Sequence, residues 1–173
     1  LGDVYKRQIV EPQILARTIL IRGMGAVVEI LCQIANLLKF KVIVQTSDKE
    51  KERYPDAANV ITEPLEIEDI DFKVDYFILA THHRNDDQIT LEALKKGIKY
   101  VGVIASIKKT QIILSFLKNN GISDEELDCL HSPTGLELKA KTPEQIALSI
   151  MSEIVMLSNN GTGRQMRELN LGK

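Results

Sequence analysis

Two glycines in GMGAVV, residues 23–28, have the spacing of a phosphate-binding loop. They follow the apolar run TILI and precede a segment with the 3.6-residue periodicity of a helix. Gly23 would allow a tight turn, Gly25 would let the backbone approach a pyrophosphate, and the N–H groups from Ala26 onwards would point at an anion. The pattern therefore predicts a site for a phosphate-bearing ligand.

Two departures from the full G-x-G-x-x-G pattern leave the identity of that ligand open. Val28 replaces the third glycine, so we expect the helix to lie further from the strand. Glu29 follows at once and would repel a phosphate if its side chain faced the loop, although Arg22 could offset that charge. A plain strand–helix turn that binds nothing is the alternative interpretation.

The end of the next expected strand, KVIVQ, argues against NAD in particular. An NAD-binding fold needs an acid at this point to bind the ribose hydroxyls, and this chain has Gln45 and Thr46 instead. An NAD(P)-dependent oxidoreductase is nevertheless the second functional hypothesis, because Ser47 and Lys49 could receive the 2′-phosphate of NADP.

Polar residues also follow two later strands of the expected sheet. THHRNDD begins with Thr81 and His82, and ASIKK combines a helix N-terminus at Ser106 with Lys108 and Lys109, which favours an anion. Adjacent histidines on an extended loop point to opposite sides, so we expect no metal site. No nucleophile is visibly paired with a base, so the sequence favours a binding protein over a catalyst.

Short apolar runs alternate along the chain with longer helical segments, which is typical of a parallel sheet built from βαβ units. The pattern predicts an α/β fold with a doubly wound, mostly parallel sheet and a helical C-terminal portion. The loops described above would then meet at the carboxyl edge of that sheet and form one crevice. We expect strands at 18–21, 41–45, 59–62, 76–80 and 100–104.

Capping residues mark where the helices should begin. Asp86 or Asp87 is expected to cap the helix over QITLEALKK, and Ser106 the helix over IKKTQIILSFLKNN. The stretches SDEE (123–126) and TPEQ (142–145) each have the spacing of a capping box.

Composition indicates one globular domain. The chain has 173 residues, of which 44% are hydrophobic, and a formal net charge of -2 without a Lys/Arg cluster, so a nucleic-acid surface is not expected. Cys32 and Cys129 stand apart, which favours two core thiols over a zinc or redox site. No apolar run has the length of a membrane helix, and we expect a cytoplasmic protein.

Five segments together resemble the C-terminal Rossmann domain of the xanthine dehydrogenase accessory protein family, also called XdhC/CoxI. The resemblance extends from about Val10 to Leu157. The chain departs from the family pattern at Val28 and Ala105, where the family has glycines. The segments are GMGAVV at 23–28, TH at 81–82, YVGVIAS at 100–106, HSPTGL at 131–136 and TPEQIALSIMSEIV at 142–155.

The resemblance implies an accessory factor for a molybdenum hydroxylase such as xanthine or carbon monoxide dehydrogenase. Such factors are thought to bind the molybdenum cofactor and to assist its maturation and insertion. The implied partners are the hydroxylase apoenzyme and an enzyme that sulfurates the cofactor, and a homodimer is a further candidate. The predicted cofactor-binding residues are Gly23, Gly25, Ala26, Thr81, His82, Ser106, Lys108, His131, Pro133 and Gly135.

The resemblance also suggests how the chain is divided. Residues 1–8, LGDVYKRQ, lack periodicity and resemble a translated sequencing-adaptor read-through, so we exclude them from fold reasoning. Residues 9–17 resemble the join between the family's smaller N-terminal domain and its Rossmann domain. We expect the Rossmann-like domain at 18–158 and a polar tail at 159–173.

Overall fold

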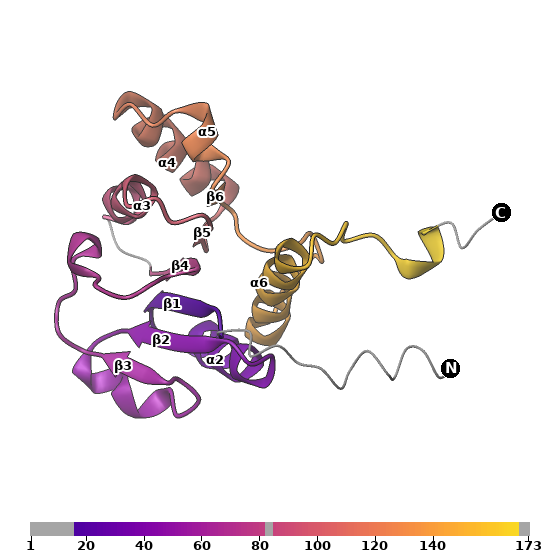
Figure 1. The fold of residues 1–173 in the computed structure, drawn as a ribbon, viewed down its shortest axis with the longest axis horizontal. Coiled ribbons are helices and arrows are strands. Elements are labelled where there is room, and N and C mark those ends of the chain that lie inside the picture. Colours follow the sequence, from indigo (N-terminus) through magenta and orange to yellow (C-terminus); the bar gives the residue numbers. More distant parts are fainter. Residues whose placement is uncertain (1–15, 82–84, 170–173) are drawn as a thin grey trace.

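Six parallel strands form the centre of the molecule, in the order β3-β2-β1-β4-β5-β6 (Figure 1). The order reverses between β1 and β4, as in doubly wound dinucleotide-binding folds, and this confirms the predicted fold class. The strands are β1 (Thr18–Gly23), β2 (Lys41–Gln45), β3 (Asn59–Ile61), β4 (Tyr76–Ala80), β5 (Val101–Val103) and β6 (Leu130–His131).

Helices connect these strands in a computed structural model that describes residues 16–81 and 85–169. The α-helices are α2 (Ala26–Leu37), α3 (Asp86–Lys95), α4 (Ile107–Asn119), α5 (Asp124–Leu127) and α6 (Pro143–Ser158). Three short 3₁₀ segments accompany them: η1 (Asp48–Arg53), η2 (Ile67–Asp69) and η3 (Met166–Glu168). Within the described ranges, no helix is long and apolar enough to cross a membrane.

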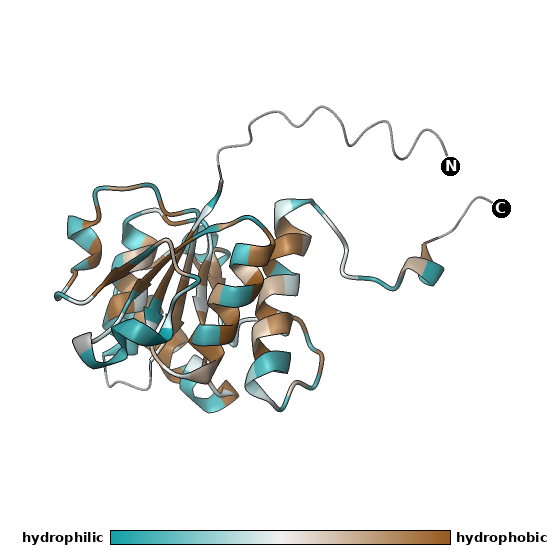
Figure 2. Ribbon diagram, turned by 90° about the horizontal axis from the view of Figure 1, so that it is seen from below, coloured by the Kyte–Doolittle hydropathy of each residue, from teal (hydrophilic) through white to brown (hydrophobic). Residues whose placement is uncertain are grey.

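The two faces of the sheet carry separate apolar layers. Ile19 and Ile21 of β1 pack with α2 and α6 on one face, whereas Leu20 packs with α3 and α4 on the other. Successive side chains of a strand point to opposite faces, so strands covered on both sides are apolar at every position. Figure 2 shows this pattern as hydrophobic strands between helices that are hydrophobic on one side only.

The predicted helix starts are confirmed at three places and wrong at one. Ser106 accepts a hydrogen bond from the backbone of α4, and both capping boxes are formed. The residue before α3 is Asn85 rather than Asp86 or Asp87. The carboxylate of Asp86 turns into the protein, and that of Asp87 accepts from the neighbouring Gln88 N–H.

Strand β6 was not predicted from the sequence. It contains only Leu130 and His131, which pair with Val101 and Gly102 of β5. Two residues are too few to show a period-two pattern. The strand nevertheless adds one more loop, residues 132–135, to the carboxyl edge of the sheet.

The division into a Rossmann-like domain at 18–158 and a polar tail at 159–173 stays a prediction, and the short segment η3 lies within the predicted tail. Strand β1 begins at Thr18 and α6 ends at Ser158. Residues 159–169 are almost all exposed and run away from the sheet in both views (Figures 1 and 2). The expected read-through at 1–8 and most of the interdomain join at 9–17 lie outside the described residues and stay predictions.

Replacing Gly23 should test the close contact between β1 and β4. A Cβ there would lie 2.3 Å from the Ala80 carbonyl oxygen, so we expect Gly23→Ala to lower the free energy of unfolding by about 3 kcal/mol. Gly121→Ala is the matched control, because Gly121 has a positive φ but open space around it, and about 1 kcal/mol is expected. Equal losses for both variants in urea unfolding would contradict this packing.

Candidate functional site

A pocket of about 420 Å³ opens at the carboxyl edge of the sheet, where the loops after β1 and β4 diverge. Its described lining contains hydroxyl and amide side chains and one guanidinium, but no carboxylate. The volume is within the usual range of small-molecule sites. The lining residues are Arg22, Gly23, Met24, Gln45, Thr46, Ser47, Thr62, Pro64, Thr81, Asn85 and Ile89.

The glycine loop forms one wall of this pocket. Gly23 pairs with Ala80 of β4, and the backbone of Gly25 has a φ of 96° with open space beside its Cα. The Gly25 N–H donates to the hydroxyl of Tyr54 at 3.1 Å. The backbone N–H of the second loop glycine is therefore already bound within the protein.

Glu29 does not point at the ligand side of the loop. Its carboxylate forms an ion pair with Arg53 of η1, which also contacts Glu50 at 2.5 Å. The cation that offsets Glu29 is thus Arg53, and not Arg22, which the sequence suggested. Val28 is fully buried between α2 and the sheet, so it packs as part of the core.

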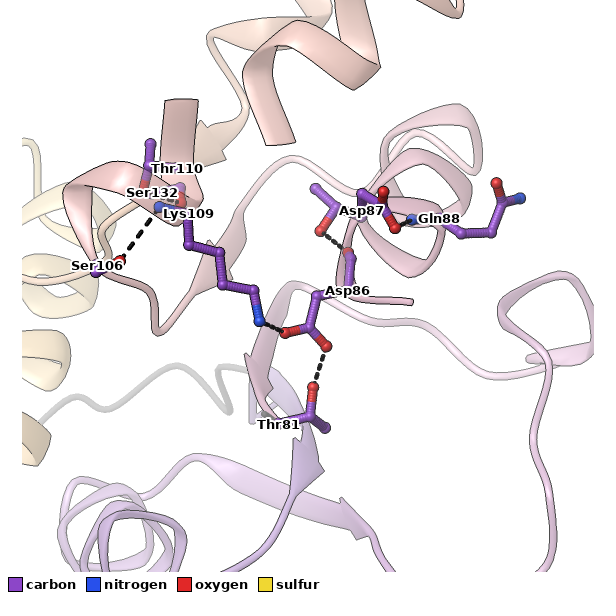
Figure 3. A network of polar contacts seen from close by, with 9 residues as sticks. Thr81, Asp86, Asp87, Gln88, Ser106, Lys109, Thr110 and Ser132 are labelled. Carbon is purple, nitrogen blue, oxygen red and sulfur yellow. Dashed lines mark hydrogen bonds and ion pairs between the residues drawn. The ribbon is translucent and has the colours of Figure 1, made fainter. Parts of the chain in front are cut away.

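A buried carboxylate joins the loop after β4 to helix α4 (Figure 3). Asp86 is 1% exposed, and it accepts hydrogen bonds from the Thr81 hydroxyl and the Lys109 ammonium group. Figure 3 shows Lys109 extended from α4 towards Asp86, with the other oxygen of Asp86 facing Thr81. The second wall of the crevice is therefore held by an ion pair, whereas Lys108 is exposed.

The segment HSPTGL packs against α6 on the other side of the sheet edge. His131 Nδ1 donates to Glu153 at 3.1 Å, and its ring stacks on Tyr100 with centroids 4.2 Å apart. The Gly135 N–H donates to the same carboxylate at 2.8 Å. A Cβ at Gly135 would lie 2.2 Å from the Ser149 hydroxyl, so glycine is required for this close approach to α6.

These donors determine the protonation of Glu153. Burial raises the pKa of this carboxyl, but hydrogen bonds from His131, Tyr100 and the Gly135 backbone outweigh burial and lower the pKa to about 2. Burial and the adjacent carboxylate also raise the pKa of the Tyr100 phenol, which therefore stays a donor. The cluster is an anchor for the loop at 131–135.

The structure brings together only part of the predicted set. Gly23 and Thr81 line the pocket, Gly25 and Ala26 form the adjoining helix start, and Ser106 and Lys108 begin α4. His131 and Gly135 contact α6, Pro133 is exposed in the same loop, and His82 lies outside the described residues. Pattern reasoning missed the roles of Tyr54, Asp86, Lys109 and Glu153, and it did not place Thr46 in the pocket.

A family model described as the XdhC Rossmann domain matches residues 19–154. The match covers all the strands except the first residue of β1, and it extends to within one turn of the end of α6. The chain belongs to the XdhC Rossmann domain family. Membership confirms the resemblance seen in the sequence.

Three similar proteins support this assignment. The uncharacterised protein YqeB of Escherichia coli K12 is 30% identical over 83% of this chain and 28% of that protein. A probable xanthine dehydrogenase subunit from Bacillus subtilis is 32% identical over 49% of this chain and 24% of that protein. The crystal structure of a xanthine dehydrogenase from Bacillus halodurans has a TM-score of 0.70 and 27% identity, over 90% of this chain and 45% of that chain. This chain thus spans less than half the length of each relative.

Removing the carboxylate of Asp86 should loosen the crevice wall. Asp86→Asn removes the buried negative charge from its ion pair with Lys109, and we expect the free energy of unfolding to fall by about 2 kcal/mol, since Lys109 is partly exposed. Asp87→Asn is the control, with a change below about 0.5 kcal/mol in urea unfolding at neutral pH. Equal costs for the two variants would show that the buried pair stabilises nothing.

The anchor at Glu153 should make stability fall in acid. Because the pKa of Glu153 is lower in the folded chain than its ordinary value of 4.5, its contribution is complete above pH 4.5 and disappears as the pH approaches 2. Across this window the free energy of unfolding of the wild type should fall more steeply than that of Glu153→Gln. Denaturant unfolding at a series of pH values measures both slopes, and parallel curves would contradict the proposed cause.

Proposed function

We propose that this domain serves as part of an accessory factor for a molybdenum hydroxylase and binds the molybdenum cofactor at the carboxyl edge of its sheet. The observation that carries the proposal is the pocket of about 420 Å³ at the switch between β1 and β4, which has no carboxylate in its described lining. Membership of the XdhC Rossmann family and the xanthine dehydrogenase names of two relatives support it.

The donor set of the pocket suits a pterin that carries a phosphate. A pterin ring presents N–H and C=O groups at its edge, and the side-chain amides of Gln45 and Asn85 can pair with either kind. The hydroxyls of Thr46, Ser47 and Thr62 can donate to phosphate oxygens. A phosphate-bearing ligand meets no carboxylate among these residues, so the described lining itself does not repel it.

The protein would hold and hand on this ligand rather than transform it. The molybdenum of the cofactor supplies redox chemistry in the hydroxylase that receives it. The ion pair between Asp86 and Lys109 fixes the wall formed by Thr81, which keeps the pocket open for a ligand. We propose a cytoplasmic hydroxylase apoenzyme as the recipient.

An NAD-dependent oxidoreductase would have the same strand order, but it would need an acidic residue at the carboxyl end of β2. The residues there are Gln45, Thr46 and Ser47, and none can bind a ribose through a carboxylate. This favours the pterin over NAD as the ligand.

Binding of the cofactor can be measured directly. Molybdenum cofactor released from a purified hydroxylase is mixed with the chain and separated by gel filtration, and the pterin is quantified by its fluorescence after oxidation. We expect the pterin to elute with the protein. Elution of free pterin only, together with a rise in melting temperature caused by NADP alone, would reverse the proposal in favour of an oxidoreductase.

A negative charge introduced into the pocket tests whether the pterin binds there. Asn85→Asp adds a carboxylate to the lining at a position favourable to the start of α3, so the fold should tolerate it while pterin retention falls about tenfold. Gln111→Glu adds the same charge near the start of α4, at an exposed position outside the pocket, and should retain the pterin. Equal retention by both variants would exclude this pocket as the binding site.

A further inference from the structure

Arg22 carries a buried nitrogen that no group of the described residues satisfies. It ends the apolar part of β1, and its side chain lines the pocket. Its Nη1 is buried and makes no hydrogen bond to any described part of the chain. A buried guanidinium nitrogen without an acceptor is costly, so its retention calls for a ligand that supplies one.

Two acids beside the crevice, Glu29 and Asp86, are paired with cations other than Arg22. Glu29 contacts Arg53, and Asp86 contacts Lys109. Among the described residues that line the pocket, only Arg22 carries a charge. The pocket therefore keeps one positive charge for which the described residues form no ion pair.

Thr46 places a second buried polar group in the same pocket. The residue is 8% exposed, and its buried Oγ1 lies beside the Tyr54 hydroxyl but has no partner at full hydrogen-bond geometry in the described ranges. Its backbone N–H donates to the Ile61 carbonyl at 3.0 Å, so the end of β2 is fixed. A hydroxyl held in this way offers a donor to whatever occupies the pocket.

The start of α2, where dinucleotide folds bind phosphate, is partly occupied by the protein itself. The Gly25 N–H donates to Tyr54, which is 2% exposed and anchored below the loop. An anion bound at this helix start would lose that N–H as a donor. Phosphate recognition is better served by Arg22, whose fork of donors matches phosphate oxygens.

We propose that Arg22 and Thr46 form an anion subsite that holds the phosphate group of the ligand, in place of the helix N-terminus used by ordinary dinucleotide folds. This rests on the proposed function in that the ligand is a bicyclic base joined to a phosphate monoester. The guanidinium binds two phosphate oxygens and the hydroxyl binds the third. Binding is then strong for the phosphorylated ligand and weak for its dephosphorylated form.

The pair GMP and guanosine tests the subsite without the molybdenum cofactor. Guanine shares the aminopyrimidinone edge of a pterin, and the two probes differ only in the phosphate. Titration calorimetry on the wild-type chain should show GMP binding at least about tenfold more tightly than guanosine, as expected for a charge-assisted contact. Equal affinities would overturn the subsite.

Variants of the two residues locate the phosphate. Arg22→Gln should reduce the affinity for GMP about tenfold without changing that for guanosine, and Arg22→Lys should lose less because it keeps the charge. Thr46→Val should reduce the affinity for GMP about threefold, because it removes one neutral hydrogen bond. Lys99→Gln is the control, since this exposed lysine lies at the amino edge of the sheet, and it should bind GMP like the wild type.

The outcomes separate this inference from the proposed function. If Arg22→Gln binds GMP like the wild type, or if Lys99→Gln loses as much, the subsite is wrong even when the chain retains molybdenum cofactor. If GMP binding depends on Arg22 but the chain retains no molybdenum cofactor, the subsite stands and the proposed function fails. Should Arg22→Gln not fold, Thr46→Val and Arg22→Lys supply the same comparison.

Discussion

The close approach of β1 to β4 is the constraint on which the whole crevice depends. A Cβ at Gly23 would lie 2.3 Å from the Ala80 carbonyl oxygen, so these strands can pair to their carboxyl ends only with glycine at this position. The strand order reverses at this pair, and the following loops therefore leave in opposite directions. The pocket is the space that their divergence creates, and the two apolar layers fix its floor.

Charge pairing then decides what the pocket can attract. Glu29 is neutralised by Arg53 from η1, and Asp86 by Lys109 from α4, so each of these two acids is held by a cation from another element. Arg22 is left with a buried nitrogen that has no acceptor in the described chain. A positive group among hydroxyls suits a phosphate better than a ribose, which agrees with the absence of an acid at the end of β2.

The sequence predicted the four central strands well because β1, β2, β4 and β5 are mostly buried on both faces. KVIVQ and YFILA coincide with β2 and β4, whose short apolar runs are typical of strands covered by helices on both sides. The crevice followed from the rule that loops meet at carboxyl ends, but its internal partners did not. Tyr54 and Gly25 are 29 positions apart, and His131 and Glu153 are 22 apart. Tertiary packing chooses such pairs, and no local pattern carries them.

The most direct test of phosphate recognition compares one pterin with and without its phosphate. Pterin recovered from the molybdenum cofactor is divided, one half is treated with phosphatase, and equilibrium dialysis measures the affinity of the wild-type chain for each half. We expect the phosphorylated form to bind at least about tenfold more tightly, because Arg22 and Thr46 lose their acceptor in the other form. Equal affinities would contradict the anion subsite, since the pocket would then recognise something other than a phosphate.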